Sequence, residues 1–168
     1  QSGQYELTIV GGYFGDQLFG LGCKVVLNQS YASTNMVSSL FCAENLLSDG
    51  AVITYGDTAF SPKILERLSK AKGDICVAVD QNWLEYWSQR MSNPLNDLET
   101  LKLNASGDIV EIGERAQGYH QIDGQYVGLI KVTKSGANLL RQVYHQSKKG
   151  GLLNKKEVER AYITDLLQ

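Results

Sequence analysis

The sequence predicts an α/β fold with a mixed, mainly parallel sheet, helices on both of its faces and an added antiparallel hairpin. Strand-like runs of apolar and β-branched residues alternate with amphipathic helical patterns through the first half of the chain. A strand, a helix and a second strand in succession favour a right-handed crossover, which makes the two strands parallel. In the second half, two alternating segments flank a turn-rich tetrapeptide, which is typical of a β-hairpin.

The first half is expected to alternate strands and helices. Each strand is a short apolar run that stops at a glycine or at a polar turn residue. Apolar residues at helical intervals indicate the first helix, and an N-cap serine followed by proline at Ser61-Pro62 indicates the second. The expected elements are strands at 6–10, 24–27, 51–55 and 74–79, a helix at 35–47 and a helix that begins at 61.

The second half is expected to add the hairpin, one strand and two helices. The hairpin turn is Asn104-Ala105-Ser106-Gly107, since these residues separate two segments of alternating polarity. Lys148-Lys149-Gly150-Gly151 is interpreted as a solvated loop rather than a domain linker. The expected elements are hairpin strands at 99–103 and 108–112, a strand at 126–132, a helix capped by Ser135 and a helix at 155–167.

Composition places the chain among soluble globular proteins. It has 168 residues, of which 43% are hydrophobic, and a formal net charge of -2, which is typical of a single folded domain over 1–168. The basic residues form no stripe, so charge gives no reason to expect a nucleic-acid partner. No apolar run reaches the length of a membrane span and the start lacks a signal-peptide pattern, which predicts a cytoplasmic protein without membrane contact.

The cysteines indicate neither a disulfide framework nor a zinc site. Cys23, Cys42 and Cys76 are far apart, odd in number and without the spacing of metal ligands. Free cysteine mostly behaves as a small buried hydrophobic residue in a reducing compartment. All three are therefore expected to be buried thiols.

Polar residues that follow strands are the first candidates for a functional site. In an open α/β sheet, ligands bind beyond the carboxyl ends of the parallel strands. Asp57 follows an uncharged strand, and a carboxylate there can hold a hard divalent cation that a nucleotide phosphate also binds. The residues alone leave open that Asp57 caps a helix or closes a turn, and that Gly11-Gly12 is only a tight turn.

Aromatic and acidic residues around position 90 form a second group of candidates. Trp83, Tyr86 and Trp87 stand at helical spacing, which favours core packing, although aromatic faces can also hold an ammonium group. Asp97 and Glu99 are placed where a carboxylate pair could bind an amine or a metal. They could equally form the exposed acidic edge of the hairpin.

A series of short motifs along nearly the whole chain resembles one enzyme family. Each motif is weak alone, but their order and spacing make the series specific. The segments are TIVGGY at 8–13, Asn28 with 31–40, YGDTAFSP at 55–62, VDQNW at 79–83, NPLNDLETLKL at 93–103, EIGER at 111–115 and GQYVGL at 124–129. Together they resemble the cytidylyltransferases that activate phosphocholine or 2-aminoethylphosphonate, and the wider sugar nucleotidyltransferase family.

The resemblance implies a three-layer Rossmann-like nucleotidyltransferase fold with CTP and a small phosphate or phosphonate acceptor as substrates. An acceptor oxygen would attack the α-phosphorus of CTP and release pyrophosphate. Asp57 would be the catalytic residue and would bind Mg²⁺, and Gly12, Asn35 and Ser38 would lie near the nucleotide. An acidic group would suit the ammonium of a zwitterionic acceptor. The residues expected to face that acceptor are Asp97, Glu99, Gln125, Tyr126 and Trp83.

The family pattern also contains two features that residues 1–168 lack. It opens with a strand and a glycine-rich, basic loop that holds the triphosphate, and it closes with a second metal-binding aspartate. The chain is therefore expected to be an incomplete domain with little activity by itself. Two other interpretations stay open: a non-catalytic binding or interaction module that keeps the fold, and a sugar-1-phosphate nucleotidyltransferase.

Overall fold

The structure is a computed structural model that describes residues 5–168. Its internal contacts group these residues into two compact units, each described separately below. The first unit comprises residues 5–48 and Leu140–Leu166, and the second comprises Asp49–Leu139 and Leu167–Gln168. The prediction of one domain over 1–168 stays a prediction, and its first four residues lie outside the described part. No helix among the described residues is long and apolar enough to cross a membrane.

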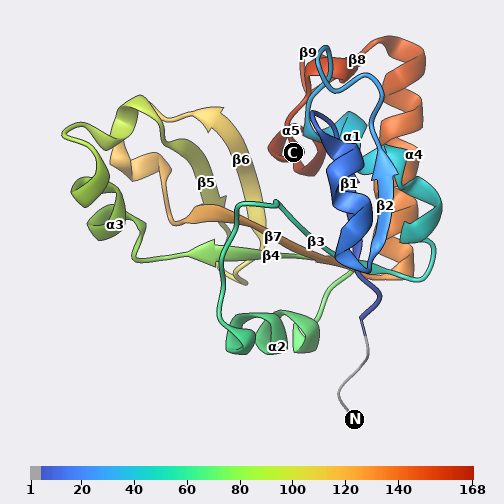
Figure 1. The fold of residues 1–168 in the computed structure, drawn as a ribbon. Coiled ribbons are helices and arrows are strands. Elements are labelled where there is room, and N and C mark those ends of the chain that lie inside the picture. The colour runs from blue at the N-terminus through green and yellow to red at the C-terminus, as the bar shows by residue number, and fades with distance from the viewer. Residues whose placement is uncertain (1–4) are drawn as a thin grey trace. The chain divides into compact units, whose positions relative to one another are not determined.

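The first unit begins with a parallel pair of short strands. β1 (Thr8–Gly11) pairs with β2 (Lys24–Leu27), and the 3-10 helix η1 (Gly15–Leu21) connects them. Figure 1 shows this β1–η1–β2 segment at the blue end of the chain. The two strands confirm the predictions for 6–10 and 24–27, with the first displaced by a residue or two.

The predicted helix at 35–47 consists of two shorter elements in the structure. α1 (Met36–Cys42) is followed by the 3-10 helix η2 (Glu44–Leu47). Ala43 separates them because its backbone, with φ −105° and ψ 23°, is not helical. The helical spacing of Met36, Leu40, Ala43 and Leu47 identified the inward-facing residues only in part, since Ala43 and Leu47 are buried but Met36 is exposed and Leu40 half-buried. On α1 the buried residues are Val37 and Phe41.

The C-terminal part of the first unit corrects two predictions. α4 (Lys134–Gly150) includes all but the last residue of the expected loop at 148–151, and the expected helix at 155–167 is largely absent. Asn154 and Lys155 have φ of 45° and 69°, a left-handed conformation that ends helical geometry and turns the chain into a hairpin. The elements observed are β8 (Leu152–Leu153), β9 (Lys156–Glu157), the 3-10 helix η5 (Val158–Arg160) and α5 (Ile163–Leu167).

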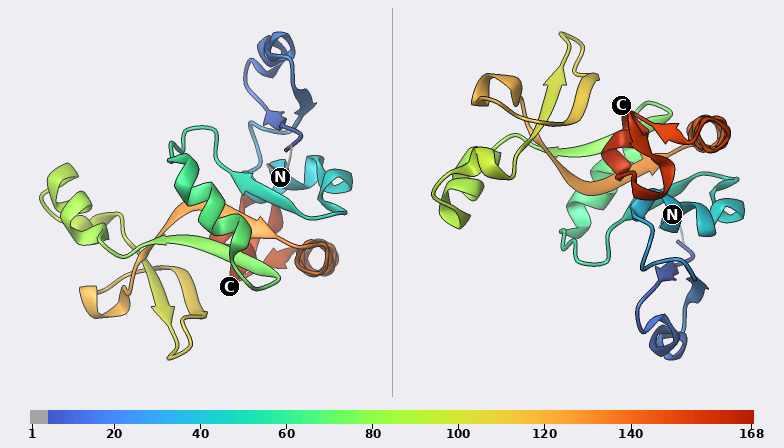
Figure 2. Two further views of the ribbon diagram at one scale, coloured as in Figure 1. Left: turned by 90° about the horizontal axis from the view of Figure 1, so that it is seen from below. Right: turned by 90° about the horizontal axis from the view of Figure 1, so that it is seen from above.

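The second unit contains a three-stranded sheet in the order β3–β7–β4. β7 pairs antiparallel with both neighbours, so β3 and β4 run in the same direction, as a strand–helix–strand crossover requires. Figure 2 shows β7 between β3 and β4 when this sheet is viewed from below. The elements are β3 (Ala51–Thr54), α2 (Pro62–Lys70), β4 (Ile75–Asp80) and β7 (Gln125–Val132).

The expectation of a mainly parallel sheet is therefore not met within the described residues. The named strands form one parallel pair, β1–β2, and every other named pair is antiparallel. The cause is the insertion of β7, a strand from the second half of the chain, between two strands of the first half. Pairing between segments this distant in sequence is not encoded in the local pattern of either one.

A hairpin and short helices complete the second unit. The predicted hairpin is present as β5 (Glu99–Leu103) and β6 (Ile109–Arg115), which pair antiparallel. Beside it lies an apolar cluster of Trp83, Leu98, Ala116 and Ile122, with Trp87 and Leu95 packed against it. The helical elements here are α3 (Trp83–Arg90), the 3-10 helix η3 (Pro94–Asn96) and the 3-10 helix η4 (Tyr119–Gln121).

The cysteines differ in part from the prediction. All three are free, as expected, but Cys42 is exposed and Cys23 and Cys76 are only half-buried. Cys42 ends α1, where its thiol donates to the carbonyl oxygen of Ser38 at 3.3 Å. Partial burial raises the pKa of the Cys42 thiol, so the less reactive protonated form is favoured.

Candidate functional site

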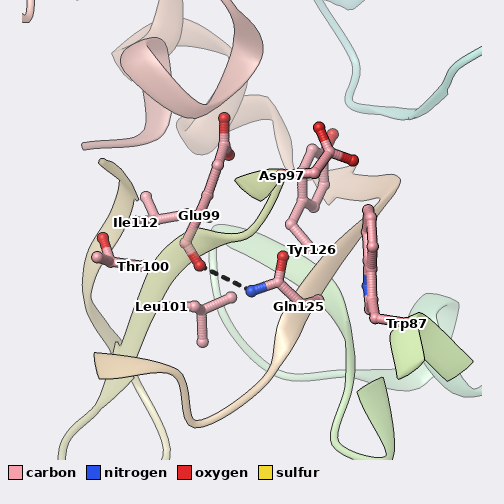
Figure 3. A pocket seen from close by; sticks show the side chains of 8 residues that line it. All are labelled: Trp87, Asp97, Glu99, Thr100, Leu101, Ile112, Gln125 and Tyr126. Carbon is pink, nitrogen blue, oxygen red and sulfur yellow. Dashed lines mark hydrogen bonds between the residues drawn. The ribbon is translucent and has the colours of Figure 1, made fainter. Parts of the chain in front are cut away.

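The second unit contains a pocket between α3, the hairpin strands and the start of β7. Its volume is about 170 Å³, well above the roughly 10–15 Å³ that one water molecule needs. Figure 3 shows the lining side chains, with the carboxylates of Asp97 and Glu99 extending toward the same side of the pocket. The residues that line it are Trp87, Asp97, Glu99, Thr100, Leu101, Ile112, Gln125 and Tyr126.

Two strands bring the polar lining together. Glu99 is the first residue of β5, and Gln125 and Tyr126 are the first two residues of β7. The buried Gln125 side chain fixes the distance between these strand starts, since its Nε2 donates to the Glu99 carbonyl oxygen at 2.7 Å. The same Nε2 lies 3.2 Å from the Gly124 carbonyl oxygen. Gln125 therefore contributes to the frame of the pocket as well as to its wall.

The acidic lining continues onto the loop before β5. Asp97 follows η3, and its backbone N–H donates to the Pro94 carbonyl oxygen at 3.1 Å. Leu98 is buried in the apolar cluster, with 1% of its surface exposed, so it anchors the chain between the two acidic residues. Alternation in an extended chain then places Asp97 and Glu99 on the pocket side. Two carboxylates and no basic side chain line this pocket among the described residues.

Aromatic rings form another wall of the pocket. Trp87 lines it from α3 and carries the Arg90 guanidinium over its ring, 5.0 Å from the ring centroid. Tyr126 meets the ring of Tyr55 edge-on, with centroids 6.0 Å apart and planes at 81°. Carboxylates beside aromatic faces form a site suited to a small organic cation, which both groups attract.

The tyrosine pair stays protonated. Burial makes the largest contribution to a raised pKa of Tyr126. The pKa is raised further by the electrostatic effect of Tyr55, by the hydrogen bond to that residue and by the charge of Glu99. Burial also raises the pKa of Tyr55, more than the hydrogen bond with Tyr126 lowers it, and the charges of Glu99 and Asp57 add to the rise. Both phenols therefore contribute neutral surfaces, and the negative charge of the pocket comes from its carboxylates.

Asp57 lies in the turn that follows β3, close to this tyrosine pair. The turn is closed by the Thr58 N–H, which donates to the Tyr55 carbonyl oxygen at 3.3 Å. The Asp57 side chain is exposed, and its charge acts on the Tyr55 phenol. The predicted strand-end position is thus observed, with the carboxylate open to solvent rather than packed in the interior.

The predicted acceptor residues fall into two groups. Asp97, Glu99, Gln125 and Tyr126 all line the one pocket. Trp83 does not line it, because its side chain is 6% exposed and packs in the apolar cluster. Trp87, one helical turn later, takes the place at the wall. Helical spacing had marked both tryptophans, but spacing does not show which of two side chains on one helix face reaches the pocket.

The predicted nucleotide residues Gly12, Asn35 and Ser38 belong to the first unit. A Cβ on Gly12 would lie 2.5 Å from the Tyr31 Cβ, so a side chain at Gly12 would displace that residue. Asn35 precedes α1 and its side-chain Nδ2 donates to the Arg160 carbonyl oxygen at 3.0 Å. Ser38 lies half-buried on α1. Their contacts within the unit are structural, and their nucleotide roles remain predictions.

Asn28 organises this part of the first unit, and sequence reasoning assigned it no role beyond its motif. It is 4% exposed, and its Nδ2 donates to Thr34 Oγ1 at 2.9 Å and to Ser39 Oγ at 3.0 Å. Its Oδ1 accepts from the Ser30 N–H at 2.9 Å. One buried amide thereby joins the end of β2, the following turn and α1. The only available signal was its position directly after a strand.

Asp165 is also buried, but its environment is that of an ion pair. The carboxylate is 2.8 Å from Lys156 Nζ and accepts the Tyr162 N–H at 2.8 Å. Lys156 in turn lies over the Tyr162 ring, 4.8 Å from its centroid. Within residues 5–168, no three histidine, cysteine or acidic side chains cluster in a way that could hold a metal ion. A metal at Asp57 would therefore need ligands from a substrate or from water.

Comparison with known proteins identifies relatives of the whole chain. A CTP:phosphoglutamine cytidylyltransferase of Campylobacter jejuni subsp. jejuni serotype O:2 is 33% identical over 178 aligned positions, which cover 99% of this chain and 70% of that protein. No family model matches the sequence.

Solved structures show the same fold at lower identity. An inositol-1-phosphate CTP transferase from T. maritima superposes with a TM-score of 0.61 at 22% identity, over 96% of this chain and 59% of that one. A candidate glucose-1-phosphate thymidylyltransferase from Bacillus anthracis gives 0.59 at 17% identity, over 95% and 61%. The chain thus spans about three fifths of the length of these structures. On the evidence of the Campylobacter relative, the chain belongs to the nucleotidyltransferase family, among the cytidylyltransferases.

Proposed function

We propose that the protein containing this chain transfers a cytidylyl group from CTP to a small phosphorylated or phosphonate acceptor that carries an ammonium group. An acceptor oxygen attacks the α-phosphorus, the bond to the β-phosphate oxygen breaks, and pyrophosphate leaves. The observation that carries the proposal is the pocket in which Asp97 and Glu99 lie with Trp87 and Tyr126. Membership of the cytidylyltransferases supports CTP as the donor.

The pocket supports a cationic rather than a neutral acceptor group. Its lining contains two carboxylates, and the aromatic face of Tyr126 attracts an ammonium, while Trp87 adds a second ring over which Arg90 lies. Phosphocholine, 2-aminoethylphosphonate and a phosphorylated glutamine share this chemistry, because each has an ammonium or amine at one end and a phosphorus oxyanion at the other. The name of the Campylobacter relative favours the amino-acid type of acceptor. A sugar phosphate lacks the cation, which makes it the weaker alternative.

Asp57 fits the role of Mg²⁺ ligand. Mg²⁺ takes hard oxygen ligands and is commonly held by one or two carboxylates together with substrate phosphates and water. Asp57 provides one such carboxylate, open to solvent at a strand end. When bound, the metal supplies charge neutralisation at the phosphates. In the same proposal Gly12, Asn35 and Ser38 contact the nucleotide.

A substrate panel tests the acceptor. Pyrophosphate release is measured for the protein at its natural length with CTP, Mg²⁺ and one of four acceptors: phosphocholine, 2-aminoethylphosphonate, phosphorylated glutamine or glucose 1-phosphate. Turnover with at least one ammonium-bearing acceptor, and a lower kcat/KM for glucose 1-phosphate, is expected. A preference for glucose 1-phosphate would replace the proposal with a sugar nucleotidyltransferase, and no turnover with any acceptor would favour a non-catalytic module.

Charge-neutral variants test the pocket. Asp97→Asn and Glu99→Gln keep size but remove charge, and a lost charge-assisted contact is expected to raise the acceptor KM roughly 10-fold or more while the CTP KM stays the same. Asp108→Asn in the hairpin turn is the matched control, since Asp108 lies outside the pocket lining. An unchanged acceptor KM in both pocket variants would remove the pocket from acceptor binding.

A binding measurement tests Asp57 apart from turnover. Calorimetric titration of the protein with CTP is carried out with and without Mg²⁺, for the native chain and for Asp57→Asn. Metal-dependent binding is expected in the native protein and a loss of that dependence in the variant. Equal metal dependence in both proteins would exclude Asp57 as the ligand.

A further inference from the structure

Tyr55 joins the turn that carries Asp57 to the strand that carries the pocket wall. It follows β3 and precedes Asp57 by two residues. Its N–H donates to the Gly128 carbonyl oxygen of β7 at 3.3 Å, and its own carbonyl oxygen accepts the Thr58 N–H at 3.3 Å. The backbone of Tyr55 is thus bonded to β7 on one side and closes the Asp57 turn on the other.

The side chain of Tyr55 continues this link. Its ring meets the Tyr126 ring edge-on at 6.0 Å, a geometry that aromatic pairs favour because a positive ring edge faces a negative ring face. The two phenol groups also lie close enough that each affects the pKa of the other. Tyr126 lines the pocket and Tyr55 does not, so Tyr55 contacts a lining residue without lining the pocket itself.

Gly128 provides the space that Tyr55 occupies. Its φ of 73° lies in the left-handed region, and a Cβ built on it would come 2.7 Å from Tyr55 Cδ2 and 3.0 Å from Thr58 Oγ1. The pairing of β7 with β4 also shifts register between Val77 and Val79. Glycine at this irregular part of β7 therefore makes room for Tyr55, because a side chain at position 128 would collide with the Tyr55 ring.

We propose that Tyr55 is a positioning residue for the acceptor: it holds Tyr126 in place on the pocket wall and fixes that wall relative to the turn that carries Asp57. The inference rests on the proposed function, since it takes the pocket as the acceptor site. A simple packing role would stabilise the unit without changing the affinity for one substrate in particular. The two roles therefore differ in which kinetic constant changes.

Hydroxyl deletion separates these roles in the protein at its natural length. Tyr55→Phe keeps the ring but removes the hydroxyl that faces the Tyr126 phenol, and it is expected to raise the acceptor KM roughly fivefold with kcat and the CTP KM nearly unchanged. Tyr119→Phe is the control, because the Tyr119 ring packs near Trp83, with ring centroids 5.8 Å apart, and Tyr119 does not line the pocket. Tyr55→Leu, which also removes the ring, is expected to raise the acceptor KM further.

A second measurement keeps this inference distinct from the proposed function. Choline binding to the 168-residue chain is followed by NMR line broadening for the native chain, Tyr55→Phe and Tyr119→Phe. Weaker binding in Tyr55→Phe alone supports the inference even if no acceptor is turned over. Turnover together with unchanged acceptor KM and unchanged choline binding in Tyr55→Phe overturns the inference and leaves the function standing. Absence of both choline binding and turnover in the native protein overturns both.

Discussion

At the scale of single residues, the buried side-chain amide of Asn28 joins several segments of the first unit. Its side chain makes three hydrogen bonds that connect the end of β2 with the turn and helix that follow. Because the amide is almost fully buried, deleting it removes these bonds and leaves the polar groups of Thr34, Ser39 and Ser30 with fewer partners. Local stability here thus depends on one polar side chain.

Asn28→Ala is predicted to destabilise the chain. Net contributions of about 1 kcal/mol per hydrogen bond give an expected loss of roughly 2–3 kcal/mol. The measurement is chemical unfolding followed by circular dichroism. Asn82→Ala is the control, because the Asn82 side chain is exposed and makes no capping bond at α3. Equal unfolding midpoints for the two variants would contradict the role given to Asn28.

Glu44 is predicted to make part of the stability depend on pH. Its carboxylate accepts from His145 Nε2 at 2.7 Å and from Arg141 Nε at 2.8 Å. The hydrogen bond from His145, followed by that from Arg141, lowers the pKa of Glu44 below its unfolded value. A depressed folded pKa gives stability that is present above the unfolded pKa and is lost as pH falls through the folded pKa.

Glu44→Gln is therefore expected to lower Tm more at pH 7 than at pH 3, because the contribution of the carboxylate decreases as pH falls toward its lowered pKa. The control is Glu66→Gln, since Glu66 pairs with Lys70 in an exposed i,i+4 bridge that contributes little. Thermal unfolding of the three proteins across this pH range provides the measurement. A Tm difference between native protein and Glu44→Gln that is as large at pH 3 as at pH 7 would refute the ionic contribution.

At the scale of elements, the start of α4 can pack closely against the beginning of β4 because Gly136 has no side chain. A Cβ on Gly136 would lie 2.1 Å from the Asp74 carbonyl oxygen, which is backbone and already accepts the Thr133 N–H at 2.9 Å. This contact cannot be relieved by rotating a flexible side chain. The glycine therefore sets the distance between the helix start and the strand.

Gly136→Ala is predicted to destabilise the chain by about 1–3 kcal/mol, although alanine is the better helix former. Gly150→Ala in the same helix is the matched control, because nothing lies within 4 Å of its added Cβ. Denaturant unfolding of both variants tests the pair. A stabilised Gly136→Ala would show that the helix start can move away from the strand without cost.

The elements also show which parts of the fold the sequence could predict. An apolar run located β2 to the residue, alternation beside a turn located β5 to the residue, and Ser61-Pro62 located the start of α2. The position of β7 between β3 and β4 could not be predicted from the sequence, since strand pairing depends on contacts between distant segments. The left-handed turn at Asn154 and Lys155 likewise depends on tertiary packing, which overrode a helical pattern at 155–167.

The candidate site could be predicted only through motif order. Asp97, Glu99, Gln125 and Tyr126 are separated by up to about a third of the second unit in sequence, and no local pattern joins them, yet they line one pocket. Tyr55 was not found, because its role depends on a ring contact with β7 that no periodicity reports. Trp87 was marked by spacing but not separated from Trp83.

At the scale of the whole molecule, charge predicts weak interaction with polyanions. The chain has 16 Lys and Arg residues and 18 Asp and Glu residues, and two of the 18 line its candidate pocket without a basic lining residue. Binding of a labelled 20-mer DNA, followed by fluorescence anisotropy, is expected to be undetectable at about 0.15 M salt, because such binding requires clustered Lys and Arg. Micromolar binding at this salt concentration would reveal a basic surface formed by residues distant in sequence.

Both tryptophans of the chain, Trp83 and Trp87, lie in α3 within one helical turn of each other. Trp83 is buried in the apolar cluster, and Trp87 lines the pocket, with the Arg90 guanidinium over its ring. The intrinsic emission of the protein therefore originates beside the candidate site. A ligand that enters the pocket can quench or shift the Trp87 component against the constant background of Trp83, which gives this protein an optical reporter without any added label.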